Sequence, residues 1–156
     1  MNLIELKPVE KTIEVQCDPA TAFSIFAERT STWWPLDKHS VSAMSGKVAK
    51  EVTIEPREGG LIYEITADGK REIWGSVVLW QPAKRLQLAW HVMRQKDQAT
   101  SVDITFHPTA SGTRVSLVHS GFEVLGKEAR ETRNGYESGW VGVFEHRFAE
   151  ACAKAA

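Results

Sequence analysis

The sequence predicts an α+β protein in which a curved antiparallel sheet is covered on one face by a long C-terminal helix. Apolar and polar residues alternate with a period of two over most of residues 48–120, which is typical of half-buried strands. The breaks between the alternating segments are short and carry turn residues such as Asp68-Gly69 and Ser111-Gly112. After about residue 131 the apolar residues recur at helical spacing instead.

The chain is predicted to begin with a strand and a helix. Residues Val9–Cys17 alternate between apolar and polar side chains, which indicates a half-buried strand. Asp18 then supplies a helix N-cap, and Pro19 fits the first helical position. The apolar face of this helix comprises Ala22, Phe23, Phe26 and Ala27. The helix is expected to end near residues 30–32, before an irregular polar stretch that reaches about Lys47.

Six further strands follow the irregular stretch. They are predicted at Val48–Pro56, Leu61–Ala67, Arg71–Gln81, Arg85–Val92, Thr100–His107 and Thr113–Ser120. Connections as short as those between them join antiparallel neighbours, because parallel strands need crossovers of about a dozen residues or more. The six strands are therefore expected to form a meander.

One face of this meander is apolar, and the end of the chain is expected to cover it. The inward-facing positions of three strands are Leu86, Leu88, Trp90, Val102, Ile104, Phe106, Val115, Leu117 and His119. The last helix, predicted from about Glu131 to Lys154, carries a matching apolar stripe. This stripe comprises Tyr136, Trp140, Val143, Phe144, Phe148 and Ala151.

Length and composition indicate one folded domain without a nucleic-acid partner. At 156 residues the chain suits a single domain, predicted over residues 1–156, with 42% hydrophobic and 25% charged residues. The net charge of −1 leaves no basic field for a phosphate backbone. Cys17 and Cys152 are expected to be buried thiols of a reducing compartment. With neither a signal peptide nor an apolar run of roughly 20 residues, we expect a cytoplasmic monomer or homodimer that does not span a membrane.

The predicted architecture suggests a cavity, because a straight helix touches a curved sheet only along a line. Gly135, Gly139 and Gly142 lie at helical spacing beside the Tyr136–Trp140 face. Each glycine costs a helix about 1 kcal/mol relative to alanine, so these positions need a reason. They could let the helix approach the sheet closely, or they could remove side chains from a cavity wall.

The aromatic residues favour a cavity for an aromatic or otherwise apolar molecule. Tryptophan is an awkward choice for simple core filling because its indole N–H needs a partner. Trp74, Trp90 and Trp140 are interpreted as pocket lining, whereas Trp33 and Trp80 are interpreted as ordinary core or surface residues. The full set expected to bind ligand is Tyr63, Glu64, Trp74, Trp90, His119, Tyr136, Trp140 and Phe144.

Several polar residues have two interpretations. His119 shares the inward parity of its strand and is either a satisfied core histidine or a catalytic group; Glu64 is a functional candidate if it points inward and surface charge if it does not. Tyr136 could offer its phenol to a ligand or merely pack. The irregular stretch could form a pocket lid or a solvated loop, and its polar residues include His39, Ser40 and Ser42. The remaining histidines are predicted to face away from the core: His91, His107 and His146.

Sequence motifs of enzymes are absent. The chain has no G-x-S-x-G elbow, no H-E-x-x-H helix, no phosphate loop and no dinucleotide fingerprint. Its histidines, cysteines and carboxylates do not fall at metal-ligand spacing. We therefore expect neither a metal ion nor a cofactor, and the sequence favours a binding protein over an enzyme.

An ordered set of short segments resembles one known family. The segments are Pro19-Ala20 with Phe23 and Phe26, Trp33-Trp34-Pro35, residues 55–64, Asp68-Gly69, residues 74–77, Trp80-Gln81-Pro82, Arg85-Leu86, Trp90, residues 112–115, residues 117–122, Leu125-Gly126 and residues 135–140. Together they resemble bacterial START-like proteins related to the activator of the Hsp90 ATPase, within the Bet v 1-like (SRPBCC) superfamily. The resemblance implies the helix-grip fold with a hydrophobic cavity under the last helix. The superfamily includes lipid and hormone binders, polyketide cyclases and co-chaperones.

Three functions are consistent with these observations. The first is a protein that binds a small hydrophobic or aromatic molecule in an internal cavity. The second is an enzyme of the cyclase or hydrolase kind that uses Glu64 or His119 as acid or base. The third is a co-chaperone-like interaction module related to the Hsp90 system, which would need an exposed apolar patch outside the cavity.

Overall fold

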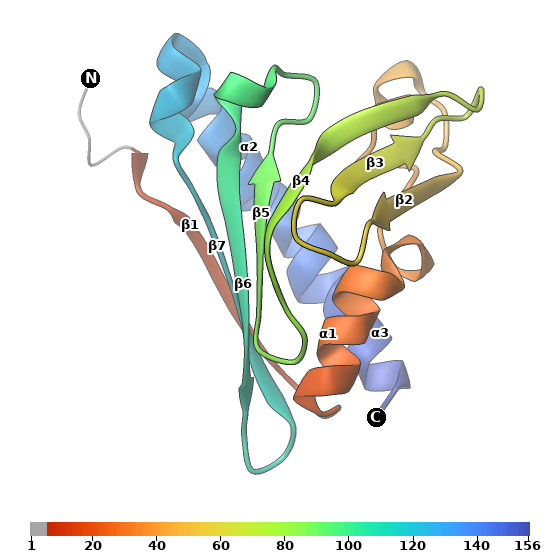
Figure 1. The fold of residues 1–156 in the computed structure, drawn as a ribbon, viewed down its shortest axis with the longest axis vertical. Helices are drawn as coiled ribbons and strands as arrows, with labels where there is room; N and C mark the ends of the chain where they lie inside the picture. Colours follow the sequence, from red (N-terminus) through yellow and green to blue (C-terminus); the bar gives the residue numbers. More distant parts are fainter. Residues whose placement is uncertain (1–5) are drawn as a thin grey trace.

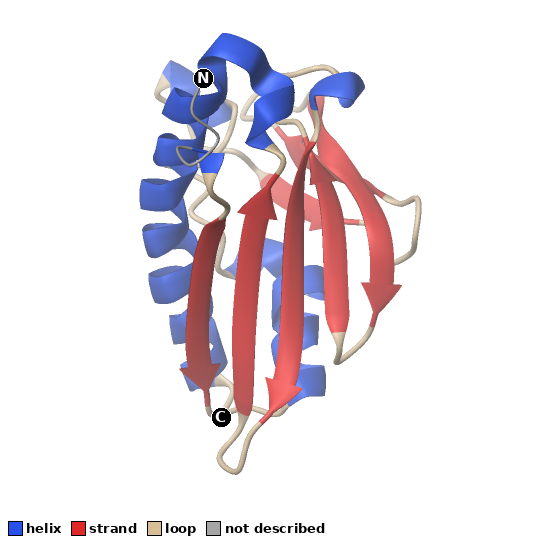
Figure 2. Cartoon of the chain, turned by 90° about the vertical axis from the view of Figure 1, so that its left-hand side faces the viewer, coloured by secondary structure: helices blue, strands red, loops and turns tan. Residues whose placement is uncertain are grey.

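The computed structural model describes residues 6–156 and shows one curved sheet with helices on one side (Figures 1 and 2). The strands are β1 (Val9–Val15), β2 (Glu51–Ile54), β3 (Leu61–Ile65), β4 (Arg71–Gln81), β5 (Arg85–Trp90), β6 (Thr100–Pro108) and β7 (Thr113–Ser120). Their order in the antiparallel sheet is β1-β7-β6-β5-β4-β3-β2. The predicted six-strand meander is confirmed, and the first strand joins it beside the last one.

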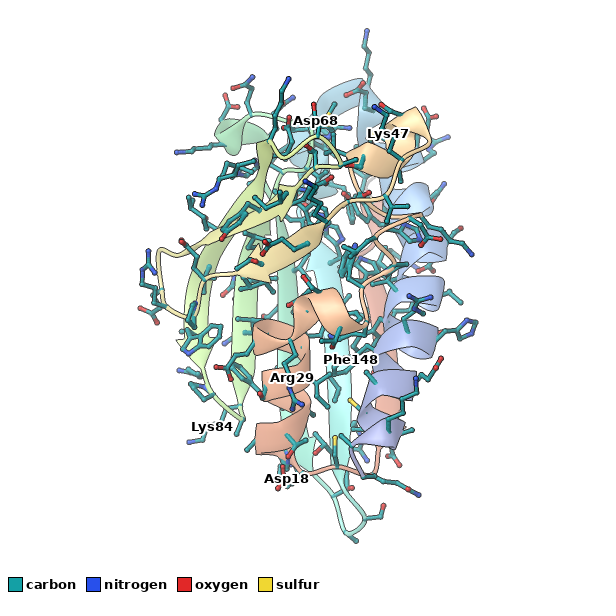
Figure 3. All side chains as sticks on the ribbon, turned by 90° about the vertical axis from the view of Figure 1, so that its right-hand side faces the viewer. Asp18, Arg29, Lys47, Asp68, Lys84 and Phe148 are labelled. Atoms are coloured by element: carbon teal, nitrogen blue, oxygen red, sulfur yellow. The ribbon has the colours of Figure 1, made fainter. Side chains whose placement is uncertain are left out.

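The first helix, α1 (Pro19–Glu28), forms as predicted. The side chain of Asp18 accepts a hydrogen bond from the backbone N–H of Thr21 at 2.8 Å, and Pro19 occupies the first turn. The helix buries Phe23 and Phe26 against the core. Figure 3 shows Asp18 at the foot of α1 and Phe148 between α1 and the C-terminal helix. The short helix thus closes one end of the sheet.

The C-terminal helix lies across the concave face of the sheet (Figures 1 and 2). It comprises α2 (Ala129–Trp140), a π-helical stretch (Val141–Phe148) and α3 (Ala149–Lys154). The helix itself was predicted, two residues shorter at its start, whereas the π-helical stretch was not. Such π-helical segments are rare in proteins, and those that do occur are often found at functional sites. The arrangement is the helix-grip fold.

Sheet curvature arises where strand register shifts. The β3–β4 pairing shifts between Ile62 and Tyr63, and the β4–β5 pairing shifts between Val77 and Leu79. Irregularities of this kind bend the strand and increase its twist. Gly75 allows a close backbone approach there, since a Cβ at this position would lie 1.9 Å from the carbonyl oxygen of Ala89. The sheet therefore turns toward the helix and leaves room beneath it.

The core confirms the predicted inward face, with one exception among the histidines. The alternating residues of β5, β6 and β7 are buried, as are Cys17 and Cys152. His107 and His146 are exposed as expected. His91 was predicted to face solvent, and this prediction is wrong: the residue is only 7% exposed. Strand β5 ends at Trp90, so the parity of the strand does not govern the residue that follows.

Two glycines provide a test of backbone fit. A Cβ at Gly135 would meet nothing within 4 Å, so alanine there should stabilise α2 without strain. We expect Gly135→Ala to raise the free energy of unfolding by about 0.5–1 kcal/mol. Gly75→Ala should strongly destabilise the protein because of its clash with Ala89. Urea unfolding of both variants checks this pair, and destabilisation by Gly135→Ala would contradict it.

Candidate functional site

A cavity of about 190 Å³ lies beneath the C-terminal helix. Five large aromatic side chains line it: Trp34, Trp74, Trp90, Tyr136 and Trp140. The remaining lining residues are Lys38, His39, Ser40, Met44, Val92, Gly139 and Val143. A larger groove of about 560 Å³ between α1 and α3 has four charged residues in its lining, among them Arg29 and Arg147. The aromatic cavity is the better match to a small-molecule site, since such sites are mostly apolar with few polar groups.

All four indole N–H groups of the cavity wall bind protein atoms. Trp34 donates to the carbonyl oxygen of His39 at 2.6 Å, and Trp74 donates to Glu64 Oε1 at 3.0 Å. Trp90 donates to the hydroxyl of Tyr136 at 3.1 Å, and Trp140 donates to His119 Nδ1 at 3.0 Å. Because their polar atoms are satisfied internally, these indoles can present ring surfaces to the cavity.

Trp34 is the centre of the aromatic cluster, and it was not among the expected site residues. Its ring centroid lies 5.3 Å from that of Trp74 and 6.0 Å from those of Trp90 and Trp140. Its neighbour Trp33 instead packs on Phe26 and Phe148, as expected of a core residue. The pair Trp33-Trp34 before Pro35 marked the segment in the sequence. Nothing local distinguished which indole faced the cavity.

Glu64 points inward and is fully buried. Its Oε1 accepts from the backbone N–H of Val41 at 2.7 Å and from Trp74. Its Oε2 accepts from the backbone N–H and from the hydroxyl of Ser42, each at 3.0 Å. The carboxylate therefore anchors the loop that carries His39, and it holds Trp74 in place. It does not line the cavity.

His119 is also fully buried and stands behind the cavity wall. Its Nδ1 accepts from Trp140, so the neutral ring carries its proton on Nε2 and donates to Thr100 Oγ1 at 2.7 Å. The Thr100 hydroxyl then donates to the carbonyl oxygen of Trp90 at 3.2 Å. Burial lowers the pKa of His119 to about 3, so the ring stays neutral at physiological pH. Both nitrogens bind protein, which is the arrangement of a satisfied core histidine.

The other expected site residues divide between the cavity and its surroundings. Trp74, Trp90, Tyr136 and Trp140 line the cavity, whereas Phe144 is buried in the core and stacks on Phe148. Tyr63 is half-buried on the other face of its strand from Glu64, with the Arg71 guanidinium 4.1 Å from its ring centroid. Of the three glycines considered, Gly139 lines the cavity. A Cβ at Gly135 or Gly142 would meet nothing within 4 Å, and a Cβ at Gly139 would meet only His39. A close approach of the helix to the sheet therefore does not explain any of the three glycines.

The irregular segment forms one wall of the cavity. Lys38, His39, Ser40 and Met44 all line it, so the segment covers the site as a lid would. The Met44 side chain is largely exposed, which places apolar surface beside the cavity. Burial lowers the pKa of His39, and the neighbouring charge of Lys38 lowers it further. The lysine is thus the main positive charge at this wall.

Residues 6–156 contain neither a metal-binding cluster nor a membrane-crossing helix. Within this range no group of three or more His, Cys, Asp or Glu side chains is placed to hold a metal ion. No helix of the same range combines the length and apolar character needed to cross a membrane.

Comparison with known proteins identifies relatives by sequence and by fold. Residues 17–151 match the family described as Activator of Hsp90 ATPase homolog 1-like protein. The solved anthrahydroquino-γ-pyrone synthase Txn09 is 27% identical, with a TM-score of 0.65 over 92% of this chain and 96% of that one. The self-sacrificing resistance protein CalC from Micromonospora echinospora is 21% identical, with a TM-score of 0.69 over 97% of each chain. Protein MLL2253 from Mesorhizobium loti is 20% identical, with a TM-score of 0.65 over 92% of this chain and 95% of that chain. No curated protein matches the sequence significantly.

Proposed function

The chain belongs to the Activator of Hsp90 ATPase homolog 1-like family, and from this premise we propose that it binds a small aromatic or other apolar molecule in the cavity beneath its C-terminal helix. The observation that carries the proposal is the wall of four indoles and one phenol around about 190 Å³ of space. A buried apolar cavity of about 150 Å³ is already large enough for benzene, so one or two fused rings suit this one.

The hydrogen bonds of the wall support binding by shape and ring contact. Since each indole N–H already has a protein partner, a ligand need not supply acceptors for them. Aromatic rings that contact each other edge to face gain about 0.5–1.5 kcal/mol beyond the burial of their area. The similarity to a synthase named for a polycyclic aromatic product is consistent with such a ligand.

The contacts of Glu64 and His119 favour binding over acid–base catalysis by these two residues. A general base must lie within hydrogen-bond reach of the proton that it removes. The Glu64 carboxylate accepts four hydrogen bonds from the protein, and both nitrogens of His119 are occupied. Neither residue lines the cavity, so both support the wall from behind.

Filling the cavity tests the proposal. Gly139 lines the cavity, and a Cβ there would lie 3.6 Å from His39 Cε1, so Gly139→Leu should occupy part of the space. Gly135→Leu adds the same side chain one helical turn away, where nothing lies within 4 Å, and serves as the matched control. We expect 1-methylnaphthalene, titrated by NMR, to shift the indole N–H signals of the wall. We expect Gly139→Leu to weaken this binding by at least about tenfold, since lost apolar contact of roughly 1.4 kcal/mol has that effect.

The control should retain wild-type affinity within about twofold, because its new side chain faces open space. Equal losses in both variants would indicate a general effect on the helix. Absence of binding to the wild-type protein across a set of one- and two-ring aromatic probes would refute the proposal itself.

A further inference from the structure

A small polar pocket adjoins the aromatic cavity. It has a volume of about 10 Å³ and is lined in part by His91, Arg94, Thr132 and Tyr136. Three residues, Trp90, Val92 and Tyr136, line both spaces, so the two spaces adjoin. The volume is close to the minimum of about 10–15 Å³ that holds one water molecule, which is also the scale of a hydroxyl group.

His91 lines this pocket and carries an unsatisfied polar atom. The residue is 7% exposed, and its Nδ1 is buried without a hydrogen-bond partner. Buried polar side-chain atoms are usually paired, and one left unpaired costs about 1–3 kcal/mol. A neutral imidazole nitrogen that lacks a proton is an acceptor. Nδ1 of His91 can therefore accept a hydrogen bond from a group that enters the pocket.

Tyr136 brings the complementary donor. Its hydroxyl oxygen accepts from Trp90 Nε1 at 3.1 Å, which leaves the phenolic proton free to donate. Within residues 6–156 the Tyr136 hydroxyl makes no second hydrogen bond to a protein atom. Burial raises the pKa of Tyr136, so the phenol keeps its proton at neutral pH.

Backbone hydrogen bonds and the Arg94 side chain connect the His91 turn to the helix that carries Tyr136. The N–H of His91 donates to the carbonyl oxygen of Trp74 at 2.7 Å, and its carbonyl oxygen accepts from Arg94 in a tight turn. Met93 lies in this turn with a left-handed φ of 61°, a conformation that costs most residues about 1–2 kcal/mol. The Arg94 guanidinium then donates to Glu128 at 2.8 Å and to Thr132 at 3.1 Å. Thr132 is one helical turn before Tyr136, so this arginine ties the His91 turn to the helix that carries the phenol.

We propose that His91 and Tyr136 form a polar subsite for a hydroxyl group, and that the ligand of the aromatic cavity is an aromatic alcohol such as a phenol. The hydroxyl oxygen accepts from Tyr136, and its proton is donated to His91 Nδ1. A hydroxyl satisfies both protein groups at once, whereas an ether only accepts and a methyl group does neither. The inference rests on the proposed function, because the ring of the ligand must occupy the cavity.

Three probes of similar size separate the contributions. We would titrate 1-naphthol, 1-methoxynaphthalene and 1-methylnaphthalene into the wild-type protein and into His91→Phe and Tyr136→Phe, following indole N–H signals by NMR. The wild-type protein should prefer 1-naphthol over 1-methylnaphthalene by about tenfold, the effect of one to two net hydrogen bonds. His91→Phe should lower the affinity for 1-naphthol to that for 1-methoxynaphthalene. Tyr136→Phe should lower the affinity for 1-methoxynaphthalene to that for 1-methylnaphthalene and leave 1-naphthol only its hydrogen bond to His91. His146→Gln, on the exposed side of the last helix, is the control and should keep the wild-type ranking.

The outcomes separate the two proposals. Binding of all three probes with equal affinity would overturn the hydroxyl subsite while leaving the aromatic cavity in place. A preference for 1-naphthol over 1-methylnaphthalene that keeps its wild-type size in both variants would also overturn it. If none of the probes binds, the proposed function fails together with the subsite. Equal weakening of all probes in a variant, with its folded spectrum retained, would show that the residue shapes the cavity without recognising the hydroxyl, and would also count against the subsite.

Discussion

Replacing Glu64 with alanine is expected to lower the free energy of unfolding by about 3–5 kcal/mol, because the change leaves several buried donors without an acceptor. The carboxylate accepts from two backbone N–H groups, one hydroxyl and the Trp74 indole. Ser42 also accepts from the backbone N–H of Ala67, so the contact joins the loop to the sheet. Loss of the Glu64 contacts should also weaken the binding of aromatic ligands, since this loop supplies one wall of the cavity.

Urea unfolding monitored by tryptophan fluorescence measures this effect. Glu64→Gln keeps the shape of the side chain, but its amide NH₂ group is a donor and faces donors that the carboxylate had accepted from. We expect this variant to lose about half as much stability as the alanine variant. Glu10→Ala removes an exposed carboxylate from β1 and should change stability by less than about 0.5 kcal/mol. A loss below about 1 kcal/mol for Glu64→Ala would show that water replaces the carboxylate and that the loop does not depend on it.

Acidification is expected to destabilise the protein through His119. Burial lowers its pKa from 6.5 to about 3 in the folded state, so the unfolded chain binds a proton in this interval and the folded protein does not. The stability contributed by the neutral ring is present above pH 6.5 and is lost as the pH falls toward 3. Each unit of acidification inside this window lowers the free energy of unfolding by up to about 1.4 kcal/mol. The total loss between pH 6.5 and about pH 4 is about 3 kcal/mol.

Comparing the slope of stability against pH between variants isolates the contribution of His119. We expect His119→Gln to be less stable than wild type at pH 7 but to lose much less stability between pH 6.5 and about pH 4.5. His146→Gln alters an exposed histidine and should keep the wild-type slope. An unchanged slope in His119→Gln would mean that His119 does not titrate as its burial requires.

Sequence patterns predicted the strands, the first helix, the C-terminal helix apart from its π-helical stretch, and the side of the sheet that is buried. Alternation predicted β4 and β7 with their observed bounds, and Asp18-Pro19 predicted the start of α1. Alternation also placed His119 inside, since parity within a strand is a local property, whereas it left the direction of Glu64 open and the structure shows that side chain buried. Four of the eight expected site residues line the cavity for the same reason: their strand or helix face points inward.

Only the tertiary structure decided what each buried polar group contacts. Glu64 meets a loop 22–23 residues earlier in the chain, His119 meets an indole 21 residues later, and Trp90 meets a phenol 46 residues later. These partners determine that Glu64 and His119 support the wall, that Trp34 joins it, and that His91 is the histidine with a free buried nitrogen. Periodicity reports which face of an element is buried. Hydrogen-bond partners depend on how distant elements are positioned against one another, and no local pattern encodes that.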